Sequence, residues 1–309
     1  MGKLETELIG WLKYRSPTVE GEIYSIKNPS IIFKNSGIIK LTDGTTFYFN
    51  RQNKLDILRI VFFALENGIR FGQNENQWKI DQTDNTIETP QKIKFYIKRI
   101  NSDIFAETFL YDVHFIDFDM DGKTVIEAGA FVGDTALYYA SKGAMVYSFE
   151  PDLESYEIAK ENISLNKHLS QNISLTNYAI GKDGEVDFPV IDATSAGSSV
   201  FISDAKFRKV RSVSVRTILR EFDINNPYLL HLDIKGLEFS VINDNALSEF
   251  DRIRIEYSPY FKGVNGESIG NLSVLLQKLR EYGFKHIRTF KHSNLRYDLL
   301  NHGTIDAMK

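Results

Sequence analysis

The chain has 309 residues, of which 42% are hydrophobic and 25% are charged, and it contains no cysteine. These proportions are typical of an ordinary globular protein, and the lack of cysteine excludes disulfides, zinc–thiolate sites and cysteine nucleophiles. The net charge of −4 gives no general attraction to nucleic acid or to an anionic membrane. Because residues 1–17 lack a secretory signal and no long apolar run follows, we expect a cytoplasmic protein.

Residues 1–95 are predicted to form a small α+β domain that acts as a cap or as an oligomerisation module. Thr42-Asp43-Gly44-Thr45 is a hairpin turn between two short alternating runs. Leu55 to Asn67 has apolar residues at helical spacing, and Gly68 is a typical helix stop. The polar stretch Gly72 to Gln91 is predicted to be a loop or linker, with the domain boundary just after it.

Residues 96–309 alternate between strand-like runs and helix-length segments, which predicts a parallel sheet with helices on both faces. Two final runs, 285–291 and 295–308, are close together and indicate a terminal hairpin, so one strand there should be antiparallel. The other expected strands are 124–127, 145–150, 173–180, 228–234 and 252–257, and the expected helices are 135–141, 152–166 and 268–282.

In folds of this kind, ligands bind beyond the carboxyl ends of the strands. The first strand ends in Glu127-Ala-Gly129-Ala-Phe131-Val-Gly133-Asp134, where two glycines allow a tight turn and a close helix start. Phe131 replaces the second glycine of a dinucleotide fingerprint, and no complete phosphate-loop pattern is present. The leading Glu127 favours a cationic ligand. The alternative is an ordinary turn; as a cofactor loop, its binding residues are Glu127, Gly129, Ala130, Gly133 and Asp134.

The next two strand ends carry candidates for binding a nucleoside. Glu150 follows the second strand, where an acidic residue can accept hydrogen bonds from both ribose hydroxyls. Asn177 and the small Ala179 follow on the third strand, and they suit the exocyclic amine and the ring of an adenine. Alternatively, Glu150 caps a helix or faces solvent, and Asn177 is a turn residue.

The fourth strand end, His231-Leu-Asp233-Ile-Lys235-Gly-Leu-Glu238, is rich in charged residues. Asp233 is the first catalytic candidate, because a carboxylate can orient a hydroxyl and accept its proton. His231 lies two residues earlier, hence on the same strand face, and is the second candidate. Lys235 and Glu238 are candidates for substrate binding. The alternatives are a helix-capping Asp233, a core His231, and a Glu238 that favours the positive end of a helix.

Glu256, at the fifth strand end, is a further candidate for substrate binding. It is expected to meet Asp233 across adjacent strands. Two such carboxylates could hold a divalent cation, share a proton, or pair with Arg252 or Arg254. The prediction that we adopt contains no metal site.

Five runs of the chain match a known sequence pattern, and they span about residues 120–260. They are Val125 to Leu137, Phe149-Glu-Pro151, Glu161 to Asn166, Ala179 to Val186, and Leu232 to Glu238. With these runs the chain resembles class I methyltransferases, and more narrowly the FkbM-like family. The resemblance implies a Rossmann-like α/β fold with a mostly parallel seven-stranded sheet and an antiparallel C-terminal strand. It also implies S-adenosylmethionine as methyl donor and O-methylation of a sugar or small metabolite.

The chain departs from the family at the fourth strand, where the usual run is Lys-x-Asp-x-Glu-Gly-x-Glu. His231 replaces the lysine and Lys235 replaces the first glutamate, which leaves open a binding or scaffold protein that has lost the chemistry. A nicotinamide oxidoreductase is disfavoured by Phe131. A nucleic-acid methyltransferase is disfavoured by the acidic balance and by the absence of an Asn/Asp-Pro-Pro-Tyr-type run. The expected partners are a small-molecule or glycan acceptor and, through oligomerisation, a second copy, but no nucleic acid or membrane.

Overall fold

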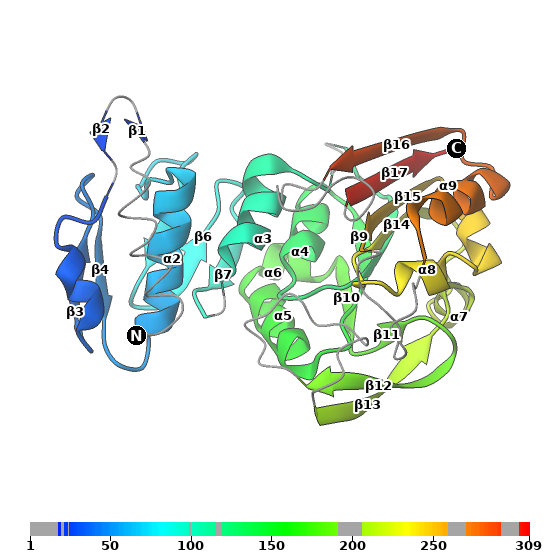
Figure 1. Cartoon of the computed structure of the whole chain (residues 1–309), viewed down its shortest axis with the longest axis horizontal. Helices are drawn as coiled ribbons and strands as arrows, with labels where there is room; N and C mark the ends of the chain where they lie inside the picture. The colour runs from blue at the N-terminus through cyan, green and yellow to red at the C-terminus, as the bar shows by residue number, and fades with distance from the viewer. Residues whose placement is uncertain are drawn as a thin grey trace. The chain divides into compact units, whose positions relative to one another are not determined.

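The computed structural model of the chain describes residues 18–19, 22–23, 25–98, 100–114, 119–190, 206–258, 270–291 and 303–309. The chain forms two compact units, Met1–Tyr111 and Asp112–Lys309, which Figure 1 shows in blue to cyan and in green to red. The predicted boundary after residue 95 falls inside strand β7, Lys94–Tyr96. Unit 1 therefore also includes α3, Ser102–Ala106, and the π-helical turn η2, Glu107–Tyr111.

Unit 1 is built around helix α2, Lys54–Asn67, which ends at Gly68 as predicted. The Gly68 backbone is left-handed, with a φ of 65°, and its N–H donates to the carbonyl of Ala64. Phe63 on the buried face of α2 packs edge-on against Trp78, with ring centroids 5.2 Å apart. The other elements of this unit are β1 Thr18–Val19, β2 Glu22–Ile23, η1 Pro29–Phe33, β3 Gly37–Lys40, β4 Thr46–Phe49, β5 Lys79–Asp81 and β6 Thr86–Glu88.

The predicted hairpin of unit 1 is confirmed, whereas the predicted loop is wrong. Strands β3 and β4 pair antiparallel across the turn at Gly44. The stretch 72–91 contains β5 and β6, which form a three-stranded antiparallel sheet with β7. A few apolar anchors, with Trp78 and Ile87 buried, hold these polar strands to the core. Composition missed them because most of their side chains remain accessible to solvent.

Unit 2 contains the predicted seven-stranded sheet, in the order β10-β9-β8-β14-β15-β17-β16. β17 alone runs antiparallel to the other six strands, and its pairing with β16 confirms the predicted terminal hairpin; residues 292–302 lie outside the described part. The strands are β8 Thr124–Ala128, β9 Met145–Phe149, β10 Ile173–Thr176, β14 Pro227–Leu232, β15 Arg252–Tyr257, β16 His286–Lys291 and β17 Gly303–Met308.

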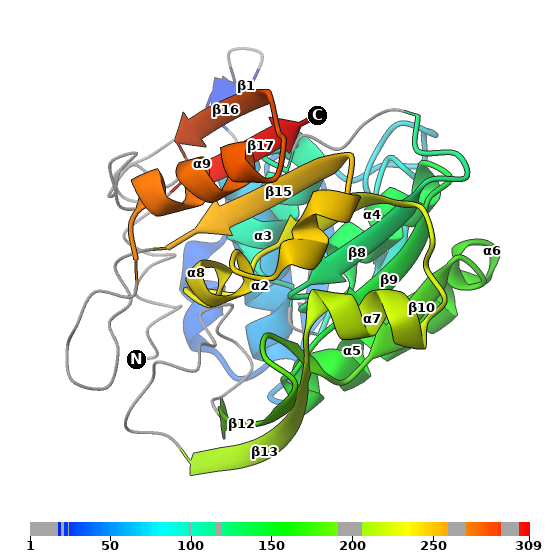
Figure 2. The same cartoon turned by 90° about the vertical axis from the view of Figure 1, so that its right-hand side faces the viewer.

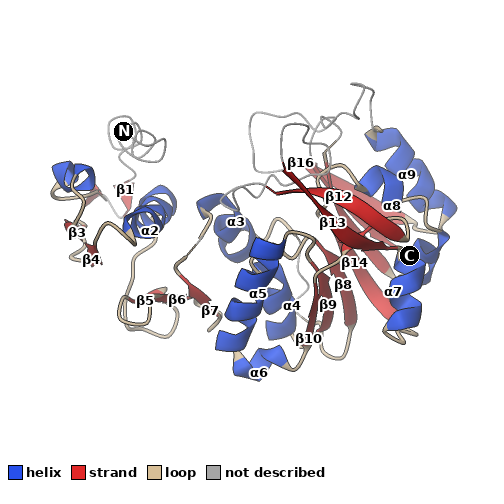
Figure 3. Cartoon of the chain, turned by 90° about the horizontal axis from the view of Figure 1, so that it is seen from below, coloured by secondary structure: helices blue, strands red, loops and turns tan. Residues whose placement is uncertain are grey.

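Helices cover both faces of this sheet, with α4 and α5 on one face and α7 and α9 on the other (Figure 3). Asp152 caps α5 by accepting a hydrogen bond from the Ser155 N–H at 2.8 Å, as predicted. The bounds are α4 Asp134–Ser141, α5 Leu153–Leu165, α6 Lys167–Ser170, α7 Val215–Glu221, α8 Glu238–Val241, the 3₁₀ turn η3 Asn245–Glu249, and α9 Leu272–Glu281.

The two faces of the sheet differ in chemistry because side chains alternate along each strand. On the face covered by α7 and α9, shown in front in Figure 2, apolar residues of neighbouring strands are in register. Ile126, Leu230 and Ile253 form one such row, and all three are fully buried. Fully burying a side chain of this kind stabilises the fold by about 1.5–3 kcal/mol. The opposite face carries the polar residues of the candidate site.

The predicted third strand, 173–180, is in fact split between two sheets. Its first half is β10, whereas β11, Ala179–Ile180, pairs with β13, Lys206–Val213, in a small sheet completed by β12, Gly184–Val190. The break coincides with the polar Asn177. Within the described residues, no helix is both long enough and apolar enough to cross a membrane.

Candidate active site

The five predicted strand ends lie side by side, because β10, β9, β8, β14 and β15 are consecutive in the sheet. Each of these strands is parallel to the next one in the sheet, so the carboxyl ends of all five share one edge. This arrangement gathers residues that are more than 120 positions apart in the chain. It is the edge at which ligands bind in open α/β sheets.

The glycine loop after β8 is held to both neighbouring strands. The N–H groups of Gly129 and Ala130 donate to the Phe149 carbonyl at 2.9 and 3.1 Å. The Gly129 backbone has a φ of +94°, and a Cβ there would come within 2.1 Å of the Asp233 carbonyl oxygen. Gly133, with a φ of +80°, caps α4. The loop therefore requires glycine at 129, where the chain passes against the end of β14.

Phe131 and Asp134 complete the loop. Phe131 has a left-handed φ of 46°, which is uncommon for a bulky residue and costs of order 1–3 kcal/mol. Its N–H donates to Glu150 Oε2 at 2.7 Å, so the strained residue is tied to the next strand end. Asp134 begins α4 and is buried, together with Ala130. Ala130 and Asp134, which were both predicted to bind the cofactor, thus also have backbone and packing roles in the loop.

Glu127 is a buried acid at the end of β8, with 1% of its surface exposed. The Ser148 hydroxyl donates to its Oε2, while its Oε1 has no hydrogen-bond partner among the described residues. Burial raises the pKa of Glu127 to about 8, and the Ser148 hydrogen bond opposes the shift only in part. A buried carboxyl oxygen without a donor is destabilising, and a ligand that brings a donor would relieve it.

Glu150 lies next to the loop at the end of β9. Its two oxygens accept hydrogen bonds from the N–H groups of Phe131 and Asp152, at 2.7 and 2.8 Å. Burial raises the pKa of Glu150 to about 8 despite these hydrogen bonds. Asn177 donates through Nδ2 to the carbonyls of Glu150 and Pro151, at 2.7 and 3.1 Å. Its amide nitrogen therefore holds the second strand end, so Oδ1 is the Asn177 atom with which an amine donor could pair.

Ala179 is the last predicted member of this group, and it is buried in β11. It lies in the small sheet that begins where β10 ends, two residues after Asn177. Asn177 thus contacts Glu150, and Glu150 contacts the glycine loop that follows β8, whereas Ala179 lies in the neighbouring small sheet.

Asp233 and Glu256 meet through Lys235. The Lys235 ammonium lies 2.6 Å from Asp233 Oδ1 and 2.7 Å from Glu256 Oε1. Burial opposes the charged form of Lys235, but the two carboxylates outweigh it and raise its pKa well above the ordinary value. Asp233 is also fixed by its backbone, because its N–H donates to the Ala128 carbonyl at 3.0 Å. The predicted proximity of the two carboxylates is thus correct, with a lysine between them.

Glu238 begins the short helix α8, as predicted, and is fully buried. Neither of its carboxylate oxygens has a hydrogen-bond partner in the described part of the chain. Burial raises the pKa of Glu238 to about 8, and the nearby Asp233 adds to this effect. Across the described ranges, no group of three or more His, Asp or Glu side chains is arranged to hold a metal ion.

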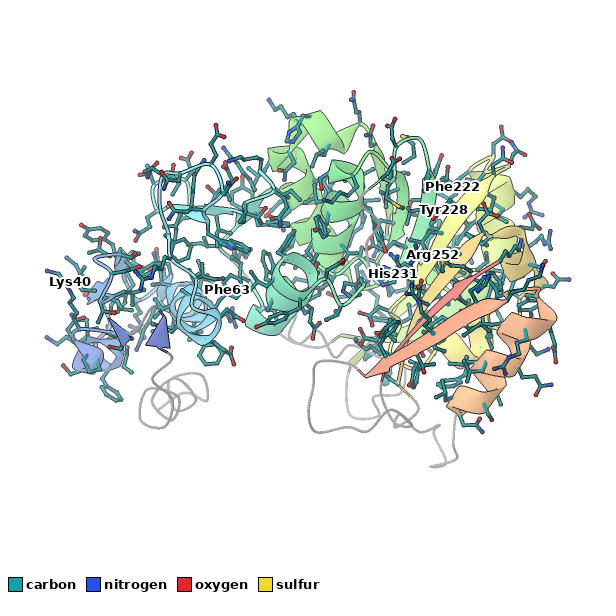
Figure 4. All side chains as sticks on the ribbon, turned by 90° about the horizontal axis from the view of Figure 1, so that it is seen from above. Lys40, Phe63, Phe222, Tyr228, His231 and Arg252 are labelled. Carbon is teal, nitrogen blue, oxygen red and sulfur yellow. The ribbon has the colours of Figure 1, made fainter. Side chains whose placement is uncertain are left out.

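His231 is an interior residue of β14, with 4% of its surface exposed. Its ring lies 4.9 Å from that of His114 and 5.9 Å from that of Tyr139, between centroids. Burial, His114 and Arg254 lower the pKa of His231 well below its ordinary value, so the imidazole is neutral. His231, labelled in Figure 4, lies within the sheet on β14, which is next to the strand that carries Arg252. Its catalytic role stays a prediction.

Sequence reasoning missed a row of buried polar residues that crosses this face of the sheet. Ser148, Glu127, His231, Arg254 and Asp306 occupy one register position on five consecutive strands. The alternation of arginine with isoleucine in Arg252-Ile-Arg254-Ile was the available signal. A buried strand with two arginines requires a buried counter-charge on a neighbouring strand.

Asp306 supplies that counter-charge. It is fully buried, and it accepts hydrogen bonds from Arg252 Nε at 2.7 Å and Arg288 Nη2 at 2.6 Å. Arg254 Nε lies 3.4 Å away, and Arg254 also donates to the Tyr139 hydroxyl at 3.2 Å. Burial alone would raise the pKa of Asp306, but the arginines hold it below its ordinary value. Arg252 and Arg254 therefore pair with Asp306, and Glu256 pairs with Lys235.

Comparison with known sequences shows that residues 127–286 match the methyltransferase FkbM domain. No curated protein sequence matches the chain. Similar solved structures include a precorrin-6y C5,15-methyltransferase from Geobacter metallireducens, at 12% identity and a TM-score of 0.37, covering 69% of this chain and 91% of that one.

Two further solved structures have comparable similarity. Magnesium protoporphyrin IX methyltransferase from Synechocystis, with bound S-adenosylmethionine, is 15% identical, with a TM-score of 0.40 and coverage of 67% of this chain and 82% of that one. A human methyltransferase 10 domain containing protein is 12% identical, with a TM-score of 0.39 and coverage of 64% and 80%.

Proposed function

We propose that this chain, which belongs to the FkbM methyltransferase family and uses S-adenosylmethionine as its methyl donor, methylates a hydroxyl of a sugar or another small metabolite. The observation that carries the proposal is the position of Asp233. Its N–H is bonded to the last residue of β8, and its carbonyl fills the space beside Gly129. A carboxyl group is thereby held next to the glycine loop, where it can meet an acceptor.

Three residues are proposed to hold the donor. Glu127 has a buried oxygen that lacks a donor, which fits the ammonium group of S-adenosylmethionine. Glu150 retains acceptor capacity for ribose hydroxyls, because each of its oxygens accepts one hydrogen bond from the described residues and a carboxylate oxygen can accept two. The hydrogen bond from Asn177 Nδ2 to the Glu150 carbonyl fixes the side-chain amide, and Asn177 Oδ1 is proposed to accept from the exocyclic amine of the adenine. When bound, the donor supplies an electrophilic methyl group on a sulfonium centre.

The acceptor is proposed to be a neutral hydroxyl. Asp233 can accept the hydroxyl hydrogen, orient the oxygen, and take up the proton that the oxygen loses on methylation. Lys235 lies between Asp233 and Glu256, so these three charges sum to −1, and the buried Glu238 is uncharged at neutral pH. A site with this charge repels phosphorylated or carboxylate acceptors and suits a polyhydroxyl compound. The same charge supports the prediction that nucleic acid is not the acceptor.

Unit 1 is proposed to cover the acceptor or to mediate self-association. This unit exposes several large apolar side chains, among them Phe33 at 55% and Tyr48 at 58%. Ile38 and Tyr48 face each other on β3 and β4 and are both exposed, so they form a contiguous apolar surface of the kind that contacts another molecule. Light scattering of the full chain, compared with a Phe33→Ser, Tyr48→Ser variant, would test the second role.

Asp233→Asn is the test of the proposed reaction. Purified protein is incubated with methyl-labelled S-adenosylmethionine and a panel of neutral sugars, polyols and phenols, and methylated products are identified by mass spectrometry. Turnover of the best acceptor should fall about 10²-fold or more in the variant, with donor affinity within about twofold. The exposed Asp187→Asn is the matched control. Methylation of amines alone, or an Asp233→Asn variant with full turnover, would contradict the proposal.

A further inference from the structure

Lys235 adopts a left-handed backbone conformation, which few residues other than glycine adopt. Its φ is +47° and that of the following Gly236 is +105°, so two successive residues are left-handed. This turn folds the lysine back over the end of its own strand, between the carboxylates of β14 and β15. Non-glycine residues in this region are strained, and such strain concentrates at functional sites.

The ammonium is a strongly bound, permanent charge. Both partner oxygens lie within 2.7 Å of its nitrogen, whose side chain is 19% exposed, while Glu256 is only 4% exposed. Two carboxylates that converge on one point at this distance would repel each other without a cation between them. Lys235 is therefore what allows Asp233 and Glu256 to remain close and ionised.

The geometry around the nitrogen also resembles that around a metal ion. Ca²⁺ binds carboxylate oxygens at about 2.3–2.6 Å, only slightly closer than the Lys235 ammonium does here. We propose that Lys235 is the resident cation of the acceptor site: it occupies the position where a divalent cation would otherwise bridge Asp233 and Glu256. As a positioning residue it orients the Asp233 carboxyl, and methyl transfer requires no added metal. The part that concerns the acceptor rests on the function proposed above.

Replacing the lysine by an acid should convert the position into a metal site. In calorimetric titrations with CaCl₂ at constant ionic strength, Lys235→Glu should bind Ca²⁺ with a Kd on the order of 10⁻⁴ to 10⁻³ M, the weak end of protein calcium sites. The wild-type chain and Lys235→Arg should show no binding. Lys235→Met removes the charge without adding an acid, and its Tm should rise when Ca²⁺ is added. This variant replaces Lys235→Glu in the test if Lys235→Glu fails to fold.

Lys209 offers a matched control on the surface. It lies between Glu185 and Asp187, at 3.9 and 3.7 Å, with its side chain 67% exposed. Lys209→Glu makes the same change in charge among loosely held carboxylates, so it should not bind Ca²⁺ in this range. Equal Ca²⁺ binding by the wild-type chain and Lys235→Glu would overturn the proposal. Folded Lys235 variants that respond to Ca²⁺ no more than Lys209→Glu would overturn it as well.

Turnover separates this inference from the proposed reaction. Wild-type methylation of the best acceptor should be unchanged by EDTA and by added Mg²⁺, whereas Lys235→Met should lose turnover with little change in donor affinity. Loss of wild-type activity in EDTA that Mg²⁺ restores would overturn the resident-cation role. If no hydroxyl acceptor is methylated at all, the proposed function fails, while the calorimetric comparison still decides what Lys235 does.

Discussion

Glu127 predicts that binding of the donor depends on pH. The residue is protonated at neutral pH in the ligand-free chain, because burial raises its pKa to about 8. A ligand ammonium next to Oε1 requires the ionised form, so binding must remove a proton. The ratio of wild-type to Glu127→Gln donor affinity should therefore rise with pH and level off above about pH 8. The ratio is the quantity to follow, because the ligand's own α-amino group, with a pKa of about 7.7–8.0, loses its proton in the same range.

The size of the effect follows from the pKa. At pH 7, ionising a group with a pKa one unit higher costs about 1.4 kcal/mol, which is a factor of about ten in affinity. The ratio of wild-type to Glu127→Gln affinity should thus increase about tenfold between pH 7 and pH 9. Glu127→Gln cannot ionise, so it does not share this gain. At pH 9 it should bind the donor about 10- to 100-fold more weakly, since a hydrogen bond to a charged group contributes about 1.5–3 kcal/mol.

The assay is calorimetric titration with S-adenosylmethionine between pH 6.5 and 9, in buffers of different ionisation enthalpy. Wild-type binding near pH 7 should release more protons than binding by Glu127→Gln. The comparison between the two proteins cancels the ligand's own titration and any proton released by Glu150. Glu157→Gln, a change at an exposed acid of α5, is the control. A ratio of wild-type to Glu127→Gln affinity that changes less than twofold between pH 7 and pH 9 would refute the reasoning.

Three further predictions concern single positions. Gly129→Ala places a Cβ 2.1 Å from the Asp233 carbonyl oxygen, so the free energy of unfolding in urea should fall by about 1–3 kcal/mol and donor affinity should fall with it. Gly44→Ala is the control, because Gly44 has a similar φ but lies in open space, and this change should leave donor affinity unchanged. Asp306→Asn leaves three arginines without their carboxylate and should destabilise the chain by about 3–5 kcal/mol in the same assay. Burial raises the pKa of Glu238 to about 8 in the folded chain, so the stability that its protonated form contributes is lost as the pH rises from the pKa of the unfolded chain through 8. In thermal unfolding, Glu238→Gln should therefore be more stable than the wild-type chain at pH 9 but not at pH 5.

Much of the fold was predictable because it depends on local patterns. The helix that ends at Gly68, the Asp152 cap and the strand-helix alternation each follow from residues a few positions apart. The weakest predictions concerned segments whose apolar residues are sparse. The stretch 72–91 forms strands through a few anchors, and 173–180 divides between two sheets. Neither outcome can be derived without knowing what the anchors pack against.

The sequence by itself determined the glycine loop after β8, since Gly129, Gly133 and the run around them are short motifs whose backbone conformation depends on neighbours in the chain. Tertiary structure alone decided which charges meet beyond the end of β14. Lys235 lies between Glu256 and Asp233, because strand order and register bring the residues that follow β14 beside the end of β15. Likewise, Arg252 pairs with Asp306, which lies 54 positions away in the sequence, although Glu256 is only four positions away. Side chains two positions apart share a face of the strand, and only the pairing of the strands reveals which charge faces them.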